Sequence, residues 1–145
     1  MRQWLNLLLL LLLLAVACSP KPQPIDYGSD SCDFCRMTIV DQQHAAELVT
    51  AKGRVYKFDA IECMIDYVQE QEAVDFAFYL VNDYLNPGQL LDANGCTFLI
   101  SPNIPSPMGA FLSAFERAEE AAQVHQEKEG QLYSWEELKT HLVKN

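Results

Sequence analysis

The alternation of apolar and polar residues predicts several short β-strands downstream of residue 36. Alternation with period two is typical of a strand whose two faces meet different surroundings. The Lys52-Gly53 dipeptide is a turn signal, so the two runs that flank it predict a β-hairpin. The predicted strands cover residues 36–41, 45–50, 54–58, 75–81 and 96–100.

Apolar residues spaced three and four apart predict three helices, over residues 59–71, 110–126 and 134–143. Asp59 with Glu62, and Ser134 with Glu137, have the spacing of a capping box at a helix start. This order of elements predicts an α+β domain in which helices pack on an antiparallel sheet. Two stretches of similar order, 32–71 and 75–145, indicate a duplicated β-β-α-like unit.

The N-terminal residues have the pattern of a bacterial lipoprotein signal. Arg2 precedes an apolar run, and the small residues Ala15-Val16-Ala17 stand directly before Cys18. We therefore expect residues 1–17 to be a signal peptide and Cys18 to be lipidated, against a plain secreted signal or an uncleaved anchor. The proline-rich residues 18–31 are expected to form a lipidated linker, which leaves residues 32–145 as a single domain.

The charge balance excludes a nucleic-acid-binding protein. The chain has 10 basic and 20 acidic residues, and its formal net charge is −10. Such a surface repels phosphate backbones. It suits an exported protein that stays soluble or attracts cations.

The stretch SCDFCRMTIV concentrates sulfur. Cys35 and Met37 face the same side if the segment is extended, and Cys32 reaches them if CDFC forms a tight turn. Thiolates together with a thioether select Cu(I) among biological metals. A C-x-x-C pair at a helix N-terminus is typical instead of a thiol–disulfide oxidoreductase. The four cysteines that remain once Cys18 is lipidated also fit structural disulfides in an exported chain. A strand after Cys35 favours the metal site over the redox pair.

Other chemically active residues leave alternatives open. Cys63 is either a ligand or an incidental surface cysteine, and Met108, in a proline-stiffened loop, is either a ligand or a contact between the following helix and the sheet. Met64 and Cys96 are interpreted as core residues. His44 is expected at the surface, with the sulfur site within its reach.

Four motifs together resemble the NosL family of lipoproteins that accompany nitrous-oxide reductase. They are AVAC, CDFCRMTI, VYKFDAIECMIDYV and SPMGAF. The resemblance implies that Cys35, Met37 and Met108 bind Cu(I), with Cys32 and Cys63 as further ligands. Arg36 departs from the family's pattern, because a glycine is usual at that position.

The resemblance also implies a role and a location. The expected function is a non-catalytic Cu(I) chaperone, anchored by lipid to a membrane and facing the periplasm. It would supply copper for the copper-sulfide centre of nitrous-oxide reductase. Its expected partners are the apo-reductase or the periplasmic and ABC-transporter parts of the maturation apparatus. The alternative is a periplasmic thiol–disulfide oxidoreductase that uses Cys32 and Cys35.

Overall fold

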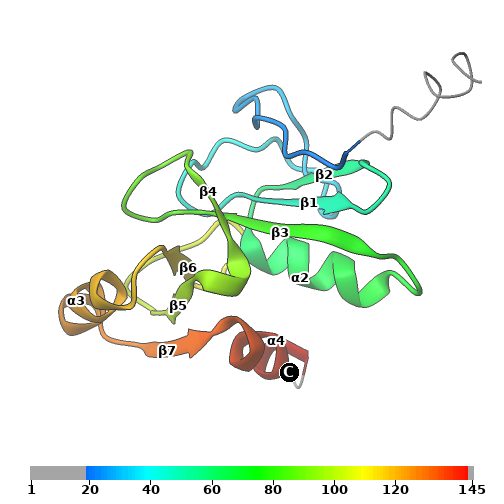
Figure 1. The fold of residues 1–145 in the computed structure, drawn as a ribbon. Helices are drawn as coiled ribbons and strands as arrows, with labels where there is room; N and C mark the ends of the chain where they lie inside the picture. The colour runs from blue at the N-terminus through cyan, green and yellow to red at the C-terminus, as the bar shows by residue number, and fades with distance from the viewer. Residues whose placement is uncertain (1–18, 144–145) are drawn as a thin grey trace, which may run out of the picture.

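The computed structural model describes residues 19–143, which form two antiparallel sheets with helices packed on them (Figure 1). The predicted α+β class is confirmed. The elements are β1 (Ala46–Thr50), β2 (Val55–Phe58), α2 (Ile61–Glu70), β3 (Phe76–Asn82), β4 (Leu90–Asp92), the 3-10 helix η1 (Ala93–Gly95), β5 (Thr97–Ile100), β6 (Leu112–Phe115), α3 (Ala118–Lys128), β7 (Gln131–Ser134) and α4 (Trp135–Val143).

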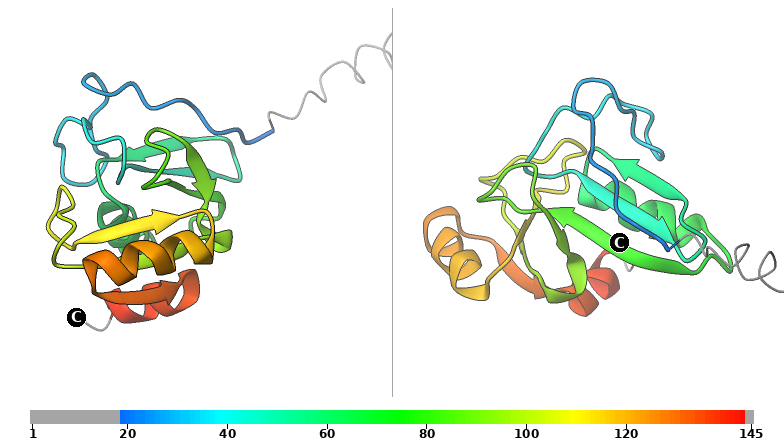
Figure 2. Two further views of the ribbon diagram at one scale, coloured as in Figure 1. Left: turned by 90° about the vertical axis from the view of Figure 1, so that its left-hand side faces the viewer. Right: turned by 45° about the horizontal axis from the view of Figure 1, so that its top comes forward.

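The first sheet has the strand order β2-β1-β3-β4. All five residues of β1 are buried, although the strand includes Glu47. Both of its faces are covered, because α2 lies against one face of the sheet and the N-terminal segment crosses the other (Figures 1 and 2). In a central strand that is covered on both faces, nearly every residue is buried, and buried and exposed residues do not alternate.

The second sheet has the order β6-β5-β7, and its two faces serve different contacts. Phe98 of β5 faces the main core together with Trp135 of α4. Leu99, its neighbour in the strand, packs with Ala121 of α3 in a smaller cluster. The two sheets meet where the amide of Tyr84, just after β3, donates to the carbonyl of Ala114 in β6 at 2.8 Å.

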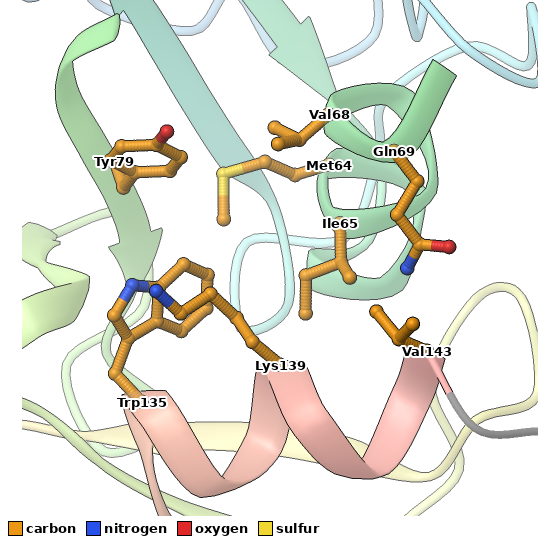
Figure 3. Close-up of a pocket in the computed structure, with 8 residues that line it drawn as sticks. All are labelled: Met64, Ile65, Val68, Gln69, Tyr79, Trp135, Lys139 and Val143. Carbon is orange, nitrogen blue, oxygen red and sulfur yellow. The ribbon is translucent and has the colours of Figure 1, made fainter. Parts of the chain in front are cut away.

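Helix α2 and helix α4 enclose an apolar pocket of about 230 Å³ with β3 (Figure 3). The side chain of Met64 points into the space between Tyr79 and Trp135. Met64 is fully buried, which confirms it as a core residue.

The structure contains the same β-β-α-β unit twice. In each unit the first strand lies between the second and the third, as the orders β2-β1-β3 and β6-β5-β7 show. The predicted duplication is therefore present. Its boundary differs from the predicted one, because β3 completes the first unit, whereas the sequence division placed residues 75–81 in the second.

Two predicted elements are wrong. Residues 36–41 form no strand; within them only Thr38 makes an isolated bridge, to Ser31. Residues 112–115 were expected in a helix but form β6, which pairs with β5 along its whole length. The helix α3 starts only at Ala118. Pairing with a distant strand outweighed the local helical spacing of these residues.

Part of the expected linker packs on the domain. Ile25 is buried in the core, and the backbone amide of Gln23 donates to Glu47 at 2.9 Å. Lys57 donates to the carbonyl of Pro24 at 2.8 Å. The predicted signal peptide and the predicted lipidation site Cys18 lie outside the described residues. Among residues 19–143, no helix has the length and apolar character that crossing a membrane requires.

Candidate metal centre

A tight turn places Cys32 and Cys35 close together. The amide of Cys32 donates to the carbonyl of Met37 at 2.8 Å, and the amide of Arg36 donates to the carbonyl of Cys32 at 3.1 Å. Arg36 has a φ of 68°, in the left-handed region that glycine adopts without strain. This conformation gives a physical reason for a glycine at that position. It also breaks the extended geometry from which we argued that Cys35 and Met37 share a face.

Four potential ligands converge beneath this turn. One ligand atom each from Cys32, Cys35, Asp59 and Cys63 lies within 4.8 Å of the others. Cys32, Asp59 and Cys63 are buried, with exposed fractions of 0%, 2% and 1%, whereas Cys35 is only partly buried. All four cysteines of residues 19–143 are free thiols. Solvent therefore reaches the cluster at Cys35 and not at the other three residues.

The start of α2 supplies two members of the cluster. Ala60 is the N-cap and has an extended backbone, and no side chain caps the helix. The capping box predicted from Asp59 and Glu62 is therefore wrong. Asp59 instead accepts a hydrogen bond from the Cys35 thiol at 3.4 Å. Sequence reasoning missed Asp59 as a site residue because its spacing from Glu62 had a simpler explanation.

Cys63 is not a surface residue. It lies off the apolar stripe of α2, yet every residue from Ile61 to Ile65 is buried. The Cys63 thiol bonds to Cys32 of the tight turn. The loop formed by residues 101–111, here called the methionine loop because it carries Met108, bonds to Glu62 in the same first turn of α2. A second protein surface over the helix start removes the solvent-facing side that amphipathic spacing predicts.

The thiols differ in acidity because they bond to one another. A hydrogen bond with Cys63, together with backbone N–H groups of the turn, lowers the pKa of Cys32 to about 6. Its partner Cys63 has a raised pKa, because it donates to Cys32 and is buried. Burial raises the pKa of Cys35 to about 11. The thiolate of the cluster is therefore held at Cys32, away from solvent.

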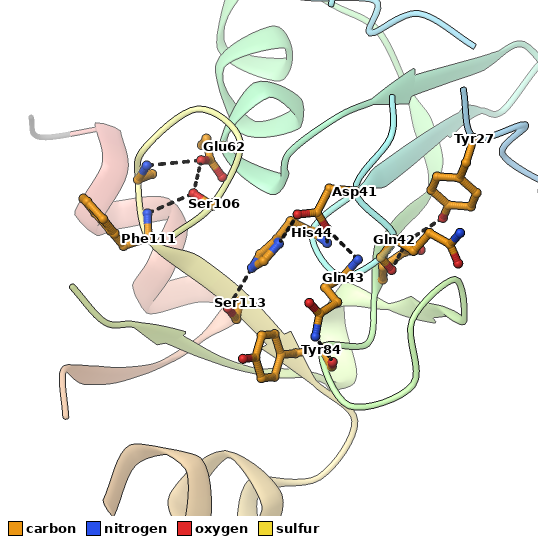
Figure 4. Close-up of polar contacts among 12 residues, drawn as sticks. Tyr27, Asp41, Gln42, Gln43, His44, Glu62, Tyr84, Ser106, Phe111 and Ser113 are labelled. Carbon is orange, nitrogen blue, oxygen red and sulfur yellow. Dashed lines mark hydrogen bonds and ion pairs between the residues drawn. The ribbon is translucent and has the colours of Figure 1, made fainter. Parts of the chain in front are cut away.

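The methionine loop is fastened to α2 through Glu62 (Figure 4). One carboxylate oxygen of Glu62 accepts from the Ser106 hydroxyl at 2.7 Å and from the Ala110 amide at 3.2 Å. The Ser106 hydroxyl in turn accepts from the amide of Phe111 at 2.9 Å. Met108 lies between these anchoring residues and is 43% exposed.

Three of the five predicted metal ligands thus lie together in the structure, namely Cys32, Cys35 and Cys63. Met37 is adjacent to the turn and 52% exposed, and Met108 is exposed in the loop beside α2. Both thioethers remain predicted ligands. Cys96 is buried elsewhere and donates to the carbonyl of Asp92, as expected of a core cysteine.

His44 lies elsewhere and is buried, so the expectation of a surface histidine is wrong. Its Nδ1 lies 3.0 Å from a carboxylate oxygen of Asp41, and its Nε2 lies 3.2 Å from the hydroxyl of Ser113 in β6 (Figure 4). Because the Asp41 carboxylate can only accept, Nδ1 donates to it, and Nε2 shares a hydrogen bond with the Ser113 hydroxyl. This is a buried hydrogen-bonded link between the two units.

Comparison with known proteins identifies a family and a similar fold. The model of the NosL family matches residues 24–143. The chain belongs to the NosL family. The fold agrees with the crystal structure of the copper chaperone NosL from Shewanella denitrificans, at 20% sequence identity and a TM-score of 0.71. That match covers 81% of this chain and 94% of the Shewanella NosL chain. The search of curated proteins found no match.

Proposed function

We propose that the chain is a Cu(I) chaperone of the cell envelope that binds copper through cysteine and methionine sulfur. The observation that carries the proposal is the cluster of Cys32, Cys35 and Cys63, which is buried except at Cys35. Thiolate ligands select Cu(I) or zinc, and exposed thioethers beside them favour Cu(I). Membership of the NosL family and the fold of a copper chaperone support the same function.

The placement of the sulfurs suits transfer rather than storage. Cys35 is the member of the cluster that is open to solvent, and Met37, which follows the turn, and Met108, on the loop bonded to α2, are both exposed. A partner protein therefore gains access to the ion from the thioether side. Neutral thioethers are weaker ligands than thiolates, so they release the ion one bond at a time to a competing ligand. We assign Cys35 as the anchoring ligand and Met37 and Met108 as the exchanging ones.

The recipient we propose is nitrous-oxide reductase, which needs copper for its copper-sulfide centre. The chaperone passes copper either directly to the apo-reductase or to the periplasmic and ABC-transporter components of the maturation apparatus. Family membership supports this recipient. The small residues before Cys18 support a lipid anchor in the cell envelope, facing the periplasm. The net charge of −10 favours docking to a basic surface of the recipient.

Thiol–disulfide exchange fits the same residues poorly. An exchanging cysteine needs an exposed sulfur with a low pKa. Here the pKa of the accessible Cys35 is raised to about 11, and the more acidic Cys32 is fully buried. The C-x-x-C pair also sits in a turn that leads into no helix.

An anaerobic Cu(I) titration against a competing chelator tests the proposal. The full chain in detergent is compared with Cys35→Ser, Met108→Ile and the control Cys96→Ser, whose thiol lies outside the cluster. We expect tight binding that Cys35→Ser weakens most and that Met108→Ile weakens by at least about tenfold, or ~1.4 kcal/mol. Cys96→Ser should bind like the wild type. Absence of competitive binding by the wild type would overturn the proposal.

Delivery and anchoring need separate measurements. Copper-loaded protein mixed with copper-free nitrous-oxide reductase should lose copper to it, and the Met108→Ile variant should transfer it at a different rate. Retention of all copper by the chaperone contradicts the proposed direct recipient. Labelling cells with a radioactive fatty acid should mark the wild type and not Cys18→Ala, and equal labelling would remove Cys18 as the lipid site.

A further inference from the structure

Two thiols of the cluster are not needed by the exchanging site described above. Cys35, Met37 and Met108 together supply three sulfurs, which satisfies a low-coordinate Cu(I) ion. Cys32 and Cys63 remain on the closed side, with exposed fractions of 0% and 1%. Their sulfurs belong to the group whose ligand atoms lie within 4.8 Å of one another.

The surroundings of these two thiols are those of a ligand pair rather than of core packing. Cys96 shows the contrast, because its thiol simply donates to a backbone carbonyl at 3.3 Å. Cys32 and Cys63 instead converge on the buried carboxylate of Asp59. One oxygen of Asp59 accepts from Cys35, and its other oxygen is buried without a hydrogen-bond partner. An unpaired buried carboxylate oxygen is costly, and a neighbouring cation compensates that cost.

The spacing is right for one ion between the two sulfurs. A metal–sulfur bond is about 2.3 Å long, so two sulfurs that share one ion in a linear arrangement lie about 4.6 Å apart. The sulfurs of Cys32 and Cys63 lie no more than 4.8 Å apart and share a hydrogen bond, so an ion between them requires only that the two sulfurs move slightly apart. Cu(I) accepts two thiolates in this way, whereas zinc in proteins takes four ligands.

We propose that Cys32 and Cys63 bind a second Cu(I) ion behind Cys35, so that the loaded chain carries two. This inference rests on the proposed function and deepens it. Each thiol that binds gives its proton to solvent, and copper stays in the +1 state throughout. In the proposed two-ion state the Cys35 thiolate bridges the two ions. The inner ion has no exposed side, so it exchanges more slowly than the outer ion.

Native mass spectrometry of the full chain, loaded with excess Cu(I) under anaerobic reducing conditions, counts the ions directly. We expect two for the wild type, two for Cys96→Ser and one for Cys63→Ser. A slow and a fast phase of copper removal by a chelator should accompany the count of two, and only the fast phase should remain in Cys63→Ser.

The possible outcomes separate this inference from the proposed function. A wild-type count of one overturns the second site and leaves the chaperone proposal standing, whereas a count of zero overturns both. A count of two in folded Cys63→Ser also overturns the inner site. Circular dichroism checks that the variant folds, and Cys32→Ser replaces it if it does not. X-ray absorption of the wild type gives an independent test, because two thiolate-bridged ions show a copper–copper distance that a single ion lacks.

Discussion

In the first β-β-α-β unit a short turn at residues 51–54 joins β1 to β2, whereas in the second unit the methionine loop, residues 101–111, joins β5 to β6. The helices differ as well. The first turn of α2 is buried all round, while α3 buries only Ala121. One unit thus provides enclosed thiols at a helix start, and the other provides an exposed thioether on a long loop.

The site depends on both units because the loop of the second lies over the helix start of the first. A single unit cannot supply both an enclosed ligand and an accessible one. A ligand at the start of a covered helix is not accessible to a partner protein, and a ligand on an exposed loop is not enclosed. Glu62 joins the methionine loop to the helix start, and His44 with Ser113 forms another link between the units, away from the thiols.

The largest expected difference between the units is in their contribution to stability. Met64→Ala in α2 should lower the free energy of unfolding by about 2–5 kcal/mol, because it empties a fully buried position. Val124→Ala in α3 should cost about 1 kcal/mol, because Val124 is only partly buried. Urea denaturation of the copper-free protein measures both. Equal losses would mean that α3 contributes as much to the core as α2.

Weakening the hydrogen bonds of Glu62 should lower Cu(I) affinity as well as stability. Glu62→Gln weakens hydrogen bonds to a charged acceptor and should cost about 1.5–3 kcal/mol of stability. Because the methionine loop is then less fixed, we expect Cu(I) affinity to fall by about tenfold. The loss of Cu(I) affinity caused by Met108→Ile should be smaller in the Glu62→Gln background than in the wild-type background.

Glu137→Gln is the matched control for Glu62. Glu137 also accepts from a serine, Ser134, at 2.7 Å, but it caps α4 in the predicted capping box. Copper affinity should not change in this variant. Strictly additive effects of Glu62→Gln and Met108→Ile would show that Glu62 does not act through the methionine.

Removing the hydrogen bond between His44 and Ser113 should lower stability without changing Cu(I) affinity. Ser113→Ala leaves Nε2 of the buried His44 without its hydrogen-bond partner and should cost about 1–2 kcal/mol. Copper affinity should stay at the wild-type value, since neither residue belongs to the thiol cluster. Ser106→Ala is the comparison, because that serine holds the methionine loop and its loss should weaken binding. A drop in affinity in Ser113→Ala would show that the interface of the two units as a whole, rather than Glu62, positions the site.

A separate expected effect is a pH dependence of stability in the reduced, copper-free protein. Cys32 has a folded pKa of about 6 against an ordinary value of 9, so between these values the unfolded chain binds the extra proton. Stability should therefore rise with pH from about 6 to 9. Above 9 it should fall, because Cys63 and Cys35 have raised pKa values in the folded state.

Thermal denaturation across that pH range, for the wild type and Cys32→Ala, measures this effect. The rise between pH 6 and 9 should vanish in Cys32→Ala. A rise of equal size in that variant would assign the dependence to other groups.

The sequence alone predicted the parts of the fold that local patterns control. The hairpin around Lys52-Gly53, the helix now seen at Ile61–Glu70 and the capping box of α4 all follow from residues close together in the chain. The duplicated order of elements was also visible, and the family was recognised from its four motifs. Each of these features depends on spacing or on turn chemistry.

Only the tertiary structure decided what lies next to what. Residues 112–115 became a strand because β5 offered a partner, and Cys63 became buried because the distant turn that carries Cys32 and Cys35 lies against it. Asp59 and Glu62 were read as caps of their own helix, yet they bind Cys35 and the methionine loop. Such contacts join residues far apart in sequence, and local periodicity carries no information about a partner surface that covers a helix or pairs with a strand.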